Sequence, residues 1–189
     1  RILAAHDSDP LPVVLRDMMK YSTNMTAEAV GMAASLAQGV VGQRPFATAD
    51  ALHTAMVDVV AALDEPARVA FYAGHPELAG DDARRGTMTD ASVAEQGTLA
   101  LAQLGGDEAA RWNALNQAYR ARFGFPFILC IRRHTRASAL QAFAQRLQHD
   151  RSTELAAALG EIAAITRLRL DHLLLGASHT ASHRAPLSS

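Results

Sequence analysis

Residues 152–175 read STELAAALGEIAAITRLRLDHLLL, and their spacing of apolar residues favours a long helix. At about 100° per residue, an α-helix places one stripe of residues on a single face. That stripe consists of Leu155, Leu159, Ile162, Thr166, Arg169 and Leu173. Arg169 therefore points toward the core, where a charge is costly unless it is paired or faces a polar cavity. The alternatives to a binding role are a structural salt bridge and a guanidinium that reaches the rim.

Other segments between residues 46 and 175 also have helical patterns. Thr48 suits the N-cap of a helix that carries Leu52, and Glu65-Pro66 suits the start of a short helix. Further helices are predicted over residues 90–104 and 107–123, and after Thr135, with Gly124 as a stop signal. Only residues 125–131 look extended and buried. These patterns predict an all-α fold, a single-domain helical bundle with one short extended segment near 125–131.

Composition narrows the function classes. The formal net charge is −1 over 189 residues, so no charge excess points to nucleic acid or to an anionic membrane. No apolar run approaches the roughly 18 residues of a membrane span. Cys130 is the single cysteine, which excludes an internal disulfide framework and fits a reducing, cytoplasmic location. No metal-binding motif of the His-Glu-x-x-His or Cys-x-x-Cys type occurs, so no protein metal site is indicated.

Three further features are candidates for chemistry, and each has a plain structural alternative. His75 lies in a helix-breaking Gly-His-Pro turn and suits acid–base work, although a loop histidine is often simply solvated. Glu95 can orient an imidazole, or it can complete a capping box with Ser92. Residues 127–131 leave backbone groups without helical partners, which a flat heterocycle could satisfy; the alternative is a core connector.

Six short motifs, taken together, resemble one enzyme family. They are Arg-Pro-Phe (44–46), Gly-His-Pro-Glu-Leu-Ala (74–79), Ser-Val-Ala-Glu-Gln (92–96), Leu-Asn-Gln-Ala-Tyr-Arg-Ala-Arg-Phe-Gly-Phe-Pro-Phe-Ile (115–128), Arg-Leu (146–147) and Ile-Thr-Arg-Leu-Arg-Leu (165–170). In order and spacing they resemble the 2-oxo-4-hydroxy-4-carboxy-5-ureidoimidazoline (OHCU) decarboxylases, the last enzymes of the urate-to-allantoin route. The resemblance covers about residues 44–175.

The resemblance implies an all-helical decarboxylase without metal or organic cofactor, which forms (S)-allantoin. Its catalytic residues fall on His75, Glu95 and Arg169. Its substrate-contacting positions fall on Pro76, Ser92, Val93, Ala94, Gln96, Phe127, Ile128, Leu129, Cys130 and Ile131. Members are often dimeric, so a homodimer is expected. Some are fused to 5-hydroxyisourate hydrolase, which suggests such a domain fused to this chain or encoded beside it.

The two ends of the chain differ from this pattern. Residues 1–39 resemble a fragment of a D-alanyl-D-alanine carboxypeptidase, a penicillin-binding protein, and we expect them to replace the family's first helical region. With Lys20 as the only lysine, that activity lacks its Ser-x-x-Lys and Lys-Thr-Gly elements. The expected division is a foreign segment 1–39, a decarboxylase-like domain 40–175 and a flexible tail 176–189. The alternatives to catalysis are an inactive helical interaction module and a remnant carboxypeptidase.

Overall fold

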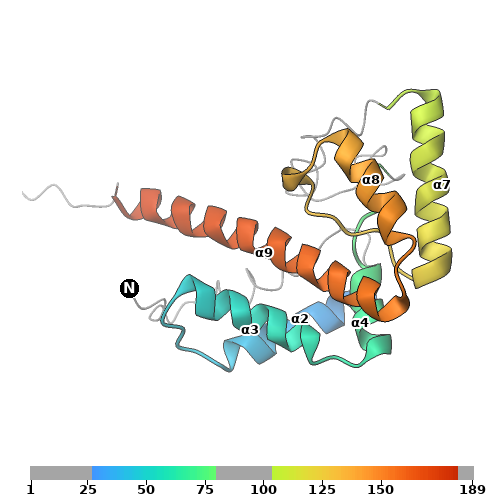
Figure 1. Cartoon of the computed structure of the whole chain (residues 1–189). Coiled ribbons are helices and arrows are strands. Elements are labelled where there is room, and N and C mark those ends of the chain that lie inside the picture. The colour runs from blue at the N-terminus through green and yellow to red at the C-terminus, as the bar shows by residue number, and fades with distance from the viewer. Residues whose placement is uncertain (1–26, 80–103, 183–189) are drawn as a thin grey trace, which may run out of the picture.

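The computed structural model describes residues 27–79 and 104–182, and the regular elements within those ranges are helices. The long last helix runs through the molecule, with α2 and α3 along one side and α7 and α8 near its N-terminal end (Figure 1). This architecture confirms the predicted all-α fold. The helices are α2 (Ala27–Val41), α3 (Ala49–Ala61), α4 (Glu65–Ala73), α7 (Gly106–Phe123), α8 (Arg136–Arg146) and α9 (Arg151–Ser182), with one 3₁₀ turn, η2 (Ile131–Arg133).

Side-chain caps fix the starts of several helices. The hydroxyl of Thr48 accepts a hydrogen bond from the Ala51 amide at 3.0 Å, as predicted for the start of α3. Asp64 caps α4 through the Ala67 amide at 2.9 Å. Thr135 begins α8 in a reciprocal capping box with Ser138. Polar residues at helix starts therefore set the boundaries that the sequence indicated.

Glycines border α7 at both ends. Gly105 is the N-cap, and Gly124 ends the helix with a φ of 79°, a conformation that glycine adopts without steric cost. The face of α7 that turns inward carries Trp112, Asn116, Tyr119 and Phe123. Leu115 of the same helix is partly buried.

Helix α9 is longer than predicted at both ends. It begins at Arg151, because the carboxylate of Asp150 accepts a hydrogen bond from the Thr153 amide at 2.7 Å and so caps the first turn. It continues to Ser182, beyond the end predicted near Leu175 and into the expected tail. The helix predicted over residues 90–104 lies outside the described residues, except for Leu104, which precedes α7.

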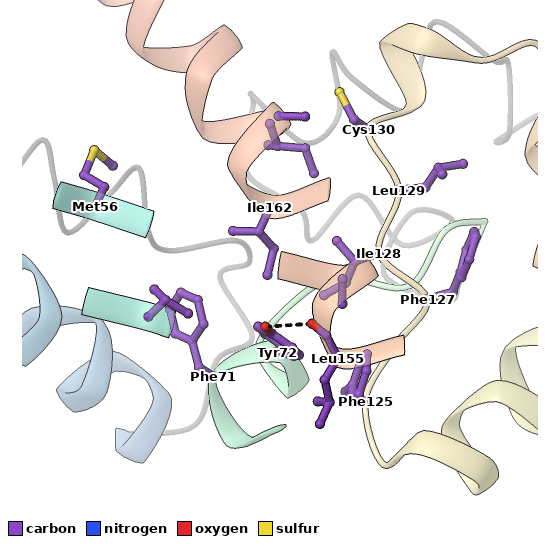
Figure 2. Packing of buried hydrophobic residues seen from close by; sticks show 14 of the residues in the cluster. Met56, Phe71, Tyr72, Phe125, Phe127, Ile128, Leu129, Cys130, Leu155 and Ile162 are labelled. Carbon is purple, nitrogen blue, oxygen red and sulfur yellow. Dashed lines mark hydrogen bonds between the residues drawn. The ribbon is translucent and has the colours of Figure 1, made fainter. Parts of the chain in front are cut away.

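The segment between α7 and η2 packs in the middle of the core. Residues 125–131 are all buried and form no helix before Ile131, as predicted. Figure 2 shows the side chains of Ile128 and Cys130 pointing toward α9, whereas Phe127 and Leu129 point to the opposite side. The Phe127 ring stacks on Phe143 of α8, with centroids 3.9 Å apart. The alternation of side chains identifies an extended strand-like chain, and it is covered by helices on both sides.

Candidate active site

His75 lies in the turn that follows α4. Gly74 ends the helix, and the amide of His75 still donates to the Tyr72 carbonyl at 3.0 Å. The side chain of His75 is buried, with 9% of the residue exposed, which removes the alternative of a solvated loop histidine. Burial, and secondly the positive charge of Arg169, hold the pKa of His75 well below its usual 6.5. The imidazole is therefore neutral at pH 7 and able to accept a proton.

Two side chains of α7 bind the residues that follow His75. The side-chain amide of Asn116 donates to the Leu78 carbonyl at 2.9 Å, and Asn116 is buried. One turn further along α7, Arg120 pairs with Glu77 at 2.8 Å. The turn that carries His75 is thus fixed by a buried hydrogen bond and by an ion pair nearer the surface.

Arg169 of α9 lies near enough to His75 for its charge to act on the imidazole. It is partly buried on the face that also buries Ile162 and Thr166, as the periodicity predicted. Its charge acts on His75, so the structure brings together two of the three residues assigned to catalysis. Arg167 points away instead, where it pairs with Asp50 and, at 3.0 Å, with Asp171. Pro76, which follows His75 directly, is partly buried in the same turn.

The backbone of the extended segment is held at two points on either side of Leu129. Arg146 of α8 donates from Nη1 to the Ile128 carbonyl at 2.7 Å. The Cys130 amide donates to Oε2 of Glu161 on α9, also at 2.7 Å. Within the described part of the chain, the N–H and C=O of Leu129 form no hydrogen bond, although this residue is buried. Buried peptide groups need partners, so Leu129 is able to bind a polar ligand.

A charged cluster centred on Glu154 and Arg146 contacts this segment, and the sequence patterns did not indicate it. Glu154 is completely buried and binds Arg146, whose Nε donates to Oε1 at 2.9 Å. The Tyr119 hydroxyl also donates to Glu154, and Nδ1 of His149 lies 2.8 Å from it. The Arg146 guanidinium lies over the Phe127 ring, 4.7 Å from its centroid. The Arg-Leu motif at 146–147 was the available signal, but helical periodicity alone does not show that Arg146 and Glu154 meet.

The remaining predicted site residues cannot be placed in this geometry. Glu95, Ser92, Val93, Ala94 and Gln96 lie outside the described residues.

Across residues 27–79 and 104–182, no group of three or more His, Cys, Asp or Glu side chains is arranged to hold a metal ion. In the same ranges, no helix combines the length and the apolar character that crossing a membrane requires.

Comparisons with known proteins agree on one family. The family model described as OHCU decarboxylase matches residues 20–171. A mouse OHCU decarboxylase is 39% identical over 151 residues, covering 80% of this chain and 85% of the relative. The uric acid degradation bifunctional protein PucL of Bacillus subtilis is 35% identical over 149 residues, covering 79% of this chain and 29% of that protein. Among solved structures, an (S)-allantoin synthase superposes with a TM-score of 0.57 at 25% identity, covering 84% of this chain and 48% of that one.

The matched range corrects the interpretation of the N-terminal segment. The match begins at residue 20, whereas the motifs suggested that the resemblance starts near residue 44. Residues 20–39, which include most of α2, therefore fall inside the family match. The resemblance of residues 1–39 to a penicillin-binding protein finds no support. With one family model over most of its length and a relative at 39% identity, the chain belongs to the OHCU decarboxylase family.

Proposed function

We propose that this chain decarboxylates 2-oxo-4-hydroxy-4-carboxy-5-ureidoimidazoline to (S)-allantoin, as a lyase of urate degradation. The observation that carries the proposal is the buried His75, whose pKa is lowered in part by the positive charge of Arg169. These two residues stand where the family motifs have their catalytic histidine and arginine. A buried titratable group with a shifted pKa beside a fixed charge is typical of a functional site. The substrate is inferred from membership of the OHCU decarboxylase family.

The chemistry follows from the state of His75. Its neutral imidazole accepts the proton of the substrate hydroxyl, and the carboxylate leaves as CO₂. The electron pair of the broken bond moves into the neighbouring ring C=N, whose nitrogen takes up a proton. The ureido-bearing carbon of that former C=N is then protonated on one face, while the carbon that lost CO₂ becomes a carbonyl. Glu95 is proposed to orient the imidazole through a hydrogen bond. No step of this proposal uses a metal or another cofactor.

Binding is assigned to two sets of groups. The Arg169 guanidinium has the fork geometry that pairs with a carboxylate in bidentate fashion. The N–H and C=O of Leu129 suit the alternating donors and acceptors of a ureido group or an imidazoline ring. We also assign contacts with the substrate to Pro76, to residues 92–96 and to the rest of 127–131.

The family resemblance also suggests partners for this chain. We propose a homodimer in the cytoplasm, and a functional link to 5-hydroxyisourate hydrolase as a fused or neighbouring protein. The match to a bifunctional protein of uric acid degradation is consistent with such a link. Sedimentation velocity would test the homodimer directly, since a single species of about 20 kDa contradicts it.

The activity is tested with freshly generated substrate. Adding the purified chain should speed loss of the substrate well above its spontaneous decay, and the variant His75→Gln should abolish that acceleration. A general base at this position is worth about 100-fold or more in rate. Full activity in His75→Gln would exclude the assigned role of this residue. No acceleration by the unmodified chain would favour the alternative of an inactive helical module.

A further inference from the structure

The extended segment has two edges with different contacts. In an extended chain, the peptide groups of residues two apart point to the same edge, and those of the residue between them point to the other. The Ile128 carbonyl and the Cys130 amide share one edge, and both are bound there by charged side chains, Arg146 and Glu161. The N–H and C=O of Leu129 point to the opposite edge.

We propose that Glu161 and Arg146 are positioning residues for substrate binding, which hold one edge of residues 128–130 so that the Leu129 peptide groups on the other edge are presented to the substrate. This inference rests on the proposed function, because it takes residues 127–131 as the binding segment. The two residues belong to different helices, Glu161 to α9 and Arg146 to α8, and they form hydrogen bonds with the backbone on both sides of Leu129.

The two anchors differ in what surrounds them. Arg146 is buried, and it is itself fixed by Glu154 and by the Phe127 ring. Glu161 is partly exposed, and its only side-chain hydrogen bond within the described residues is the one from the Cys130 amide. Removing Arg146 also leaves the buried Glu154 without its main counter-ion, so that change disturbs the fold. Glu161 is therefore the anchor whose role can be tested separately from stability.

Three substitutions of Glu161 separate its hydrogen-bond acceptor from its charge. Glu161→Gln removes the charge but keeps an oxygen at the same reach. Glu161→Asp keeps the charge but shortens the side chain by about 1.5 Å, which breaks a 2.7 Å bond. Glu161→Leu removes both. Arg167→Gln is the matched control, because Arg167 lies on the same helix but pairs with Asp50 and Asp171.

Steady-state decarboxylation gives the first readout. We expect Glu161→Asp and Glu161→Leu to raise KM about tenfold with little change in kcat, since the lost contact stabilises bound substrate and transition state alike. Glu161→Gln and Arg167→Gln should keep the KM of the unmodified chain. An unchanged KM in Glu161→Asp overturns the proposal. A raised KM in Glu161→Gln alone also overturns it. Either result would show that substrate binding does not depend on a hydrogen-bond acceptor held at the distance of the Glu161 carboxylate.

Amide hydrogen exchange of Cys130 gives a second readout that needs no turnover. Protection should persist in the unmodified chain and in Glu161→Gln, and it should fall about tenfold or more in Glu161→Asp. Equal exchange in all of these proteins overturns the positioning role, even if Glu161→Leu fails to fold. No turnover by the unmodified chain refutes the proposed function instead. Turnover with the same KM in every variant refutes only the role of Glu161.

Discussion

Replacing Arg146 by methionine tests the buried cluster most severely. Glu154 is completely buried, and Arg146 contacts it through both Nε and Nη2. A methionine of similar length fills the space but leaves a buried carboxylate whose remaining contacts are Tyr119 and His149. Breaking a buried ion pair in this way costs about 3–5 kcal/mol. The Ile128 carbonyl also loses its donor, so we expect about 4 kcal/mol in total.

Urea denaturation followed by far-ultraviolet circular dichroism measures this loss. For a chain of this size, the melting temperature should also fall by about 10 °C. Arg120→Met is the matched control, because the side chains of Arg120 and Glu77 are 48% and 29% exposed and such pairs contribute about 0–1 kcal/mol. The double variant Arg146→Met/Glu154→Leu should recover much of the loss. If Arg146→Met lowered the unfolding free energy no more than Arg120→Met, the assigned role of the cluster would be refuted.

Three further predictions concern the site and its surroundings. Because the pKa of native His75 lies below 6.5, the unfolded chain binds more protons than the native chain just below that pH. The free energy of unfolding, measured in urea, should therefore fall as the pH drops below 6.5, and His75→Gln should flatten this pH dependence. The same shift places the acid limb of kcat/KM below pH 6.5, and a limb centred above 7 would contradict a buried, neutral base. Gly124→Ala should cost about 1 kcal/mol in chemical denaturation, because a φ of 79° strains alanine while the added Cβ would meet Val69 at an ordinary 3.6 Å.

Local signals in the sequence predicted much of the helical framework. Thr48 and Thr135 cap helices where the pattern placed them, and Gly124 ends α7. The end of α9 was misjudged because the small, polar residues after Leu175 resemble a linker, whereas the helix continues through Ser182. Short-range patterns indicate where helices begin more reliably than where a long one stops.

The candidate site was only partly predictable, for a physical reason. Arg169 was found because helical period alone turns it inward, while the importance of His75 came from its motif and not from its local pattern. Glu154 and Arg146 were missed because their burial depends on a contact between α8 and α9. Glu161 was missed because a partly exposed glutamate on a helix looks like a solvated residue until its bond to the Cys130 amide is seen.

The enantiomeric composition of the product tests the central claim most directly. Freshly generated substrate is incubated with and without the purified chain, and the allantoin formed is followed by circular dichroism. Spontaneous decay gives a racemate without a lasting signal. With the chain present, we expect faster loss of substrate and a persistent signal of (S)-allantoin that disappears in His75→Gln. Racemic allantoin formed at the spontaneous rate would contradict the assignment of decarboxylase activity to this chain.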